Sequence, residues 1–362
     1  MKISHQQLSA PLLPQVAALS GEDPVQIQLR GAVDIDALTT LILACLLSRK
    51  TAPILIDIAG NALTSSAQES LHRSLFIPLL LPKGLSKGKY EIDPAEVAVR
   101  ENFIVPKVLL LPAEALVCNN SREFQRLIAQ AFRRAEIVVP TELLILLSSI
   151  GFEATLNAEE HGSVRLGGGE SNEGIRGFAA MVHADGTTLD SRAREYVSQY
   201  VAQFRRPEGG WLEIIVIDNG MGLAYPNFYL SALERGLDNP HLYTTNPAIE
   251  RARLEEALKD GFTTKGRWGK LVSTQTRPGA GTEVIRKRLG SVRGYSALRT
   301  GRSAATWSYL RPRVAYVRNT LRGDHPDNIQ PFIIQTVQPE FVFEGTAWQF
   351  VIPLTAQAEL PL

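Results

Sequence analysis

The chain has 362 residues, 44% of them hydrophobic and 21% charged, and its formal net charge is +1 at pH 7. This composition excludes a disordered chain and a protein that is basic over its whole surface, and the length suits two ordinary domains. Two cysteines, Cys45 and Cys118, are too few for a disulfide framework and lack metal-ligand spacing, so we expect buried thiols. No apolar run approaches the roughly 20 residues that cross a bilayer, and no signal-peptide core is recognised, so a cytoplasmic protein without a membrane partner is expected.

Residues 1–115 predict a small α/β domain. Apolar side chains alternate over residues 25–31, a helical run with an Asp cap follows over 34–48, and a short apolar strand over 52–60 ends at a glycine. The order strand, helix, strand is typical of an α/β unit. His72 stands on a predicted helix, and we interpret it as a packing or surface residue rather than a phosphoacceptor.

A domain boundary is expected near residues 112–121, with a second domain over 116–362. There, residues 121–137 predict a helix capped by Ser121, and 141–162 predict a longer helix that ends near His161 and Gly162.

On the longer helix, Glu153 and Asn157 are four residues apart and therefore on one face. An Asn oxygen can join the ligand shell of a hard cation such as Mg²⁺, and a Glu can orient or deprotonate a water molecule. The alternative is an ordinary solvated helix face, which often carries such a pair.

Residues 214–222, "IIVIDNGMG", are an apolar run that ends at Asp218 and passes through Gly220 and Gly222. One interpretation is a hairpin turn, for which Asn-Gly is a strong signal. The other is a carboxylate held at a strand end as a hydrogen-bond acceptor, beside glycines that let a flat ligand approach the backbone.

Gly279 and Gly281 precede a helical stretch, and glycines at a helix N-terminus expose backbone N–H groups that bind anions. Lys265 adds a charge suited to phosphate, and Gly266 with Gly269 forms an alternative cradle. The strand predicted after Gly345 and Thr346 could be no more than an edge strand.

In chain order, these segments resemble the ordered boxes of the GHKL ATPase superfamily, which includes gyrase-type, MutL-type and histidine-kinase ATP-binding domains. The resemblance covers about residues 140–355. The matching segments are Glu153 to Asn157 with His161-Gly162, Asp218 to Gly222, Phe262 to Lys265, Gly279 to Gly281, and Gly345-Thr346. It departs from the usual glycine-rich box at Thr282 and Glu283.

The resemblance implies a Bergerat-type α/β sandwich that binds ATP with Mg²⁺. It implies that Asp218 accepts a hydrogen bond from the adenine amino group, that Gly220 and Gly222 make room for the base, and that Thr346 supports the adenine side. Asn157 would bind Mg²⁺ and Glu153 would activate water. Residues 261–282 would form a lid whose Lys265, Gly279 and Gly281 face the phosphates.

The leading hypothesis is an ATP-hydrolysing conformational switch of GHKL type, whose N-terminal domain, loosely similar to a STAS module, binds a protein partner. One alternative is a histidine or serine protein kinase acting in trans. Another is a nucleotide-gated interaction or nucleic-acid-binding module with little turnover. A homodimer is left open.

Residues 284–323 contain no Asp or Glu but ten Arg and Lys residues, with Trp307, Tyr309 and Tyr316 among them. Such a stretch can bind nucleic acid, but we favour arginines paired with acidic residues elsewhere. Residues 300–340 are interpreted as an insertion.

Overall fold

The computed structural model describes the following residues: 2–8, 15–16, 18, 25–35, 37–48, 54–58, 108–112, 120–134, 138–162, 176–183, 210–220, 222–223, 246–258, 281–308, 332–336 and 342–354. They form two compact units, and the division between them falls at Val108 and Leu109. The α/β class predicted for the chain is confirmed.

The first unit is a parallel sheet with a crossover helix. Its elements are β1 (Lys2–Leu8), β2 (Val25–Ile35), α2 (Ala37–Ser48) and β3 (Ile54–Ile58), and the strand order is β1-β2-β3. Both strand pairs are parallel, so β2, α2 and β3 form the predicted strand–helix–strand unit. The helix begins later than predicted, because β2 continues through Asp34.

Helix α2 is apolar on most of its surface and contributes Leu41, Ile42, Leu43 and Leu46 to the buried residues. Cys45 on the same helix is 1% exposed, in agreement with the expected buried thiol. Cys118 and His72 lie outside the described residues. Among the helices that the structure describes, none has both the length and the apolar character needed to span a bilayer.

The second unit is built on a seven-stranded sheet in the order β4-β5-β6-β10-β7-β8-β9. Neighbouring strands from β5 to β9 are antiparallel. The strands are β4 (Val108–Pro112), β5 (Arg176–His183), β6 (Trp211–Asp218), β7 (Tyr295–Gly301), β8 (Ser303–Ser308), β9 (Ile333–Thr336) and β10 (Phe343–Pro353).

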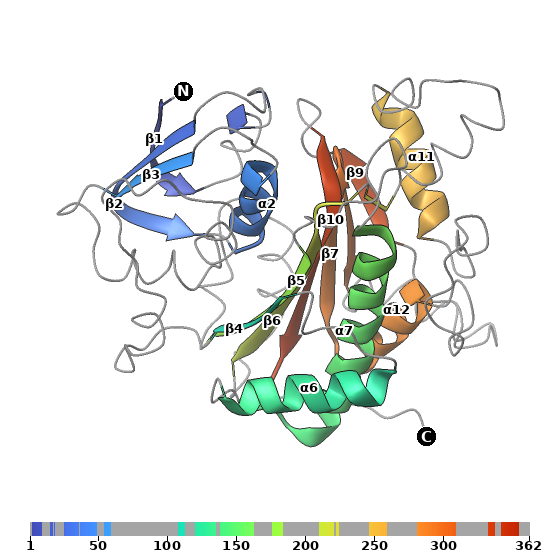
Figure 1. Ribbon diagram of the computed structural model, residues 1–362. Helices are drawn as coiled ribbons and strands as arrows, with labels where there is room; N and C mark the ends of the chain where they lie inside the picture. Colours follow the sequence, from blue (N-terminus) through green and yellow to red (C-terminus); the bar gives the residue numbers. More distant parts are fainter. Residues whose placement is uncertain are drawn as a thin grey trace. The chain divides into compact units, whose positions relative to one another are not determined.

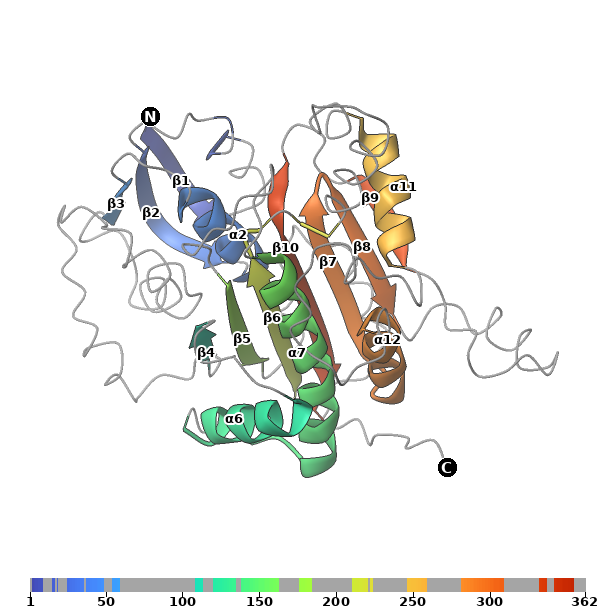
Figure 2. The same cartoon turned by 45° about the vertical axis from the view of Figure 1, so that its right-hand side comes forward.

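Four helices accompany this sheet: α6 (Ser121–Arg134), α7 (Thr141–Gly162), α11 (Pro247–Ala257) and α12 (Gly281–Ser291). Helix α7 runs along one face of the sheet, with α12 beside it, and α6 crosses near the N-terminal end of α7 (Figures 1 and 2). The predicted helix over residues 141–162 is confirmed at both ends.

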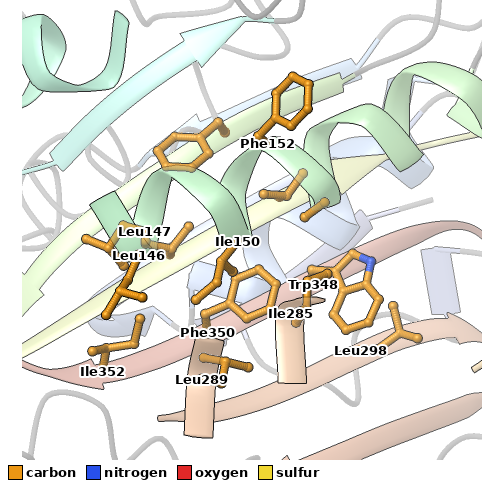
Figure 3. Packing of buried hydrophobic residues seen from close by; sticks show 14 of the residues in the cluster. Leu146, Leu147, Ile150, Phe152, Ile285, Leu289, Leu298, Trp348, Phe350 and Ile352 are labelled. Carbon is orange, nitrogen blue, oxygen red and sulfur yellow. The ribbon is translucent and has the colours of Figure 1, made fainter. Parts of the chain in front are cut away.

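A single apolar cluster joins these helices to one face of the sheet. Leu146, Leu147 and Ile150 of α7 point toward the side chains of β10, with Ile285 and Leu289 of α12 beside them (Figure 3). On β10, the rings of Trp348 and Phe350 stack with centroids 5.7 Å apart. Residues 348, 350 and 352 of β10 belong to this cluster, as does residue 298 of the neighbouring strand β7. The residues between them on β10 face the opposite side of the sheet, as the two-residue period of a strand requires.

The region interpreted as an insertion, residues 300–340, is part of the sheet where the structure describes it. Strand β8 pairs with β7 and β9 pairs with β8, so both extend the same antiparallel sheet. These two strands are therefore part of the sheet, and residues 309–331 between them lie outside the described residues. The edge-strand alternative for β10 is wrong, because β10 lies between β6 and β7.

Helix α6 begins with a cap that the sequence prediction placed one residue too late. The Asn120 Oδ1 atom accepts hydrogen bonds from the backbone N–H groups of Arg122 at 3.1 Å and Glu123 at 3.0 Å. Asn120, rather than Ser121, is thus the capping residue, and its side chain satisfies N–H groups that have no partner within the helix.

We therefore expect Asn120→Ala to lower the free energy of unfolding by about 1 kcal/mol. Ser121→Ala is the matched control, and because Ser121 is exposed on the first turn it should leave stability nearly unchanged. Chemical denaturation of the two variants beside the wild-type protein measures the difference. Equal stabilities of the two variants would contradict the assignment of the cap.

Candidate functional site

Strand β6 ends on a buried carboxylate. All eight residues of β6 are buried, and Asp218 at its end is 2% exposed. The Asp218 Oδ1 atom accepts a hydrogen bond from the Gly220 N–H at 3.0 Å, which turns the chain as it leaves the strand. Both sides of β6 are occupied, by β5 and β10, so Asn219-Gly220 does not begin a hairpin partner of β6.

The chain after this turn has a conformation that favours glycine. Gly222 has a φ angle of +82°, a left-handed value that L side chains rarely adopt. Gly220 and Gly222 are both buried. The chain directly after Asp218 therefore has two buried positions that carry no side chain.

Thr346 of β10 is the cross-strand partner of Asp218. It is 5% exposed. Just before it, the pairing of β10 with β7 shifts register between Phe343 and Thr346, which marks a β-bulge. Two residues predicted from distant parts of the sequence thus lie opposite each other on adjacent central strands.

Asp218 and Thr346 lie on the face of the sheet that carries the helices. Val216 of β6 and Trp348 of β10 belong to the cluster shared with α7 and α12. Asp218 is two residues after Val216, and Thr346 two residues before Trp348, so the strand period places both on this face. The apolar face of the sheet therefore ends in polar groups.

Glu153 and Asn157 continue the stripe of α7 that packs on the sheet. The spacing from Leu146 to Ile150, Glu153 and Asn157 is that of positions on one helix face. Leu146 and Ile150 are buried, whereas Glu153 and Asn157 are half-buried. The polar pair thus stands at the border between the core-facing stripe and the more exposed side of α7, which carries Ile145 and Ser149.

The direction of α7 brings this pair toward the end of β6. In Figure 3, Leu146 lies toward Ile352 and Ile150 toward Phe350, so α7 advances as the β10 numbering falls. From Ile150 to Asn157 a helix advances about 10 Å, and from Phe350 to Thr346 a strand advances about 13 Å. Asn157 therefore lies near the end of the sheet that carries Thr346.

The predicted phosphate-binding elements are described only in part. Helix α12 begins at Gly281, as the glycine pattern predicts, and Thr282 in its first turn is buried. Gly279 and Lys265, with the rest of the predicted lid up to residue 280, lie outside the described residues. Within the parts of the chain that the structure covers, no three His, Cys, Asp or Glu side chains gather into a metal cluster.

In the described part of the basic stretch, several side chains lie inside the protein. Arg286 is 4% exposed, and its guanidinium carbon lies 5.7 Å from the centre of the Phe332 ring. Trp307 is 5% exposed within the apolar cluster. These two side chains are therefore too deeply buried to bind a nucleic acid. Tyr309 and the region 309–331 lie outside the described residues.

Arg302, also in this stretch, forms an ion pair with an acidic residue elsewhere in the chain, as the sequence analysis favoured, although the partner was not identified there. Glu250, in the first turn of α11, is fully buried, and its Oε1 atom accepts hydrogen bonds from the Arg302 N–H at 2.7 Å and the Ser303 hydroxyl at 3.0 Å. The Arg302 guanidinium lies 3.4 Å from the other carboxylate oxygen. These contacts join α11 to the turn between β7 and β8.

Thr300 is the second residue that sequence reasoning missed. It is fully buried on β7, opposite Thr346, and its hydroxyl contacts both segments that flank the Asp218 carboxylate. Its partners are 77 and 45 residues away in the chain, so no local pattern could have identified it.

No protein-family model matches the chain, and a search of curated proteins finds no significant match.

Proposed function

We propose that the second unit binds ATP with Mg²⁺ at the end of the sheet that carries Asp218, and hydrolyses it as a conformational switch. The observation that carries the proposal is the pairing of Asp218 with Thr346 at the ends of two central strands. A buried carboxylate, a hydroxyl and a glycine-containing turn form a donor and acceptor set that fits a neutral purine with an exocyclic amino group.

In this proposal, Asp218 accepts the hydrogen bond from the adenine amino group, and Thr346 supports the same edge of the base. Gly220 and Gly222 would let the ring lie against the backbone, because glycine carries no side chain of its own. The finer fold assignments, a Bergerat-type sandwich here and a STAS-like first unit, belong to the same proposal.

The phosphate end would be held by other residues. Asn157 would bind Mg²⁺ and Glu153 would orient and deprotonate the attacking water, while the metal ion would neutralise phosphate charge. The start of α12 at Gly281 supports an anion site, since its first backbone N–H groups have no partners within the helix. Lys265 and Gly279 are proposed to complete this site.

The proposal is tested by measuring phosphate release from ATP and nucleotide binding in the same samples. We expect Glu153→Gln to keep ATP affinity within about twofold and to lower turnover by about 10²-fold to 10⁴-fold, because only the general base is lost. Glu142→Ala is the matched control, since Glu142 is exposed on the first turn of the same helix. It should leave binding and turnover unchanged.

Two results would contradict parts of this account. Full turnover in Glu153→Gln would show that Glu153 is not the base. No ATP binding by the wild-type protein would remove the proposed site altogether. Binding without turnover in the wild-type protein would instead favour a kinase acting on another protein, which transfer of labelled γ-phosphate to candidate proteins would test.

A further inference from the structure

The Thr300 hydroxyl joins three segments of the second unit. Its Oγ1 atom accepts a hydrogen bond from the Leu223 N–H at 3.1 Å and donates one to the Gly345 carbonyl oxygen at 2.8 Å. Leu223 belongs to the turn after β6, Gly345 to the bulge of β10, and Thr300 itself to β7. One hydroxyl therefore uses both its donor and its acceptor to hold two irregular segments together.

Both segments are ones that regular sheet pairing does not fix. Leu223 follows Gly222, which has a left-handed backbone, and Gly345 lies where the register of β10 shifts. Asp218 precedes the first segment by a few residues, and Thr346 directly follows Gly345. The positions of both adenine-contacting residues thus depend on backbone that the Thr300 hydroxyl restrains.

The burial of Thr300 makes these hydrogen bonds costly to remove. The residue is 0% exposed, so water does not readily replace a lost partner. Replacing the hydroxyl by a methyl group of similar size leaves the partly buried Leu223 N–H and the buried Gly345 carbonyl without this partner, which is unfavourable for both groups. The two segments would be expected to move apart to find other partners or water.

We propose that Thr300 is a positioning residue that sets the geometry of the adenine end of the site, and so its preference for adenine. This inference rests on the proposed ATP binding. Thr300 does not need to touch the nucleotide, because it acts through the turn at Gly222-Leu223 and the bulge at Gly345-Thr346.

The experiment compares Thr300→Val with Thr300→Ser and Ser296→Ala in the full chain. Thr300→Val removes the donor and acceptor but keeps the shape, whereas Thr300→Ser keeps both hydrogen bonds. Ser296 is the matched control because it is fully buried on the same strand and face, and its hydroxyl has no hydrogen-bond partner among the described residues.

Three quantities are measured: the affinity for ATP, the affinity for GTP, and the hydrogen-exchange rate of the Leu223 amide without nucleotide. Guanine has a carbonyl oxygen where adenine has its amino group, so the ratio of ATP to GTP affinity reports the placement of Asp218. We expect Thr300→Val to weaken ATP binding by about 10-fold, to lower the ATP to GTP ratio, and to speed exchange at Leu223. Thr300→Ser and Ser296→Ala should resemble the wild-type protein.

An unchanged ATP to GTP ratio in folded Thr300→Val would overturn this inference while leaving ATP binding intact. The same loss of selectivity in Ser296→Ala would also overturn it, since that residue makes no such hydrogen bonds. If Thr300→Val does not fold, Thr300→Ala is measured in its place by the same criteria. Failure of the wild-type protein to bind ATP would overturn the proposed function and this inference together.

Discussion

Asp218→Asn is expected to weaken ATP binding about 100-fold while leaving the fold intact. The new side chain keeps a carbonyl oxygen for the Gly220 N–H, which now bonds Asp218 Oδ1 at 3.0 Å. It replaces the other carboxylate oxygen by an NH₂ group, which cannot accept a hydrogen bond from adenine. A 100-fold loss is about 2.7 kcal/mol, within the range for hydrogen bonds to charged groups.

An ATP titration monitored by calorimetry measures the affinity, and thermal unfolding of the same samples measures the stability. Asp218→Ala is the comparison variant, because it removes the adenine acceptor and also the hydrogen bond that forms the turn. It should bind ATP no better than Asp218→Asn and should be less stable. An unchanged ATP affinity in Asp218→Asn would mean that other residues recognise the adenine base.

Gly345→Ala should destabilise the second unit strongly. Gly345 has a φ angle of +150°, and a Cβ atom built on it would lie 2.4 Å from the Asp218 carbonyl oxygen and 3.0 Å from the Asn219 Cα atom. Both are backbone atoms that cannot rotate away. We expect a loss of about 3 kcal/mol in the free energy of unfolding, from backbone strain and overpacking together.

Gly290→Ala is the matched control for this prediction. Gly290 lies in α12, and its added Cβ atom would meet only Trp307, at an ordinary contact distance of 3.7 Å. Alanine favours the helix over glycine by about 1 kcal/mol, so this variant should be as stable as the wild-type protein or more so. Denaturant unfolding distinguishes the two, and a Gly345→Ala variant with wild-type stability would show that the bulge can relax.

The elements that were predicted well have strong local signals. Helix α7 carries a long apolar period bounded by Thr141 and Gly162, and β6 is a continuous apolar run that stops at Asp218. The cap of α6 was misplaced by one residue, because Asn120 and Ser121 are both good capping residues and only the hydrogen bonds distinguish them. Residues 303–308 and 333–336 are short strands whose identity depends on pairing with distant neighbours.

In the candidate site too, residues with a local sequence signal were predicted, and residues whose roles depend on distant contacts were missed. Asp218, Gly222 and Gly281 were predicted from patterns of adjacent residues, and the structure brings Asp218 and Thr346 into register. Thr300 and Glu250 were missed because their roles arise from contacts between segments 45 to 77 residues apart. A buried threonine in a strand is a common residue, and only its two partners distinguish it.

The most direct test of the account is photolabelling of the wild-type protein with 8-azido-ATP in the presence of Mg²⁺, followed by mapping of the labelled peptides. The azide sits on the adenine ring, so the label reports the base and not the phosphates. We predict that label appears in peptides containing residues 211–223 or 342–354 and that excess ATP suppresses it. Label confined to other peptides, or label that ATP does not suppress, would contradict an adenine site at the ends of β6 and β10.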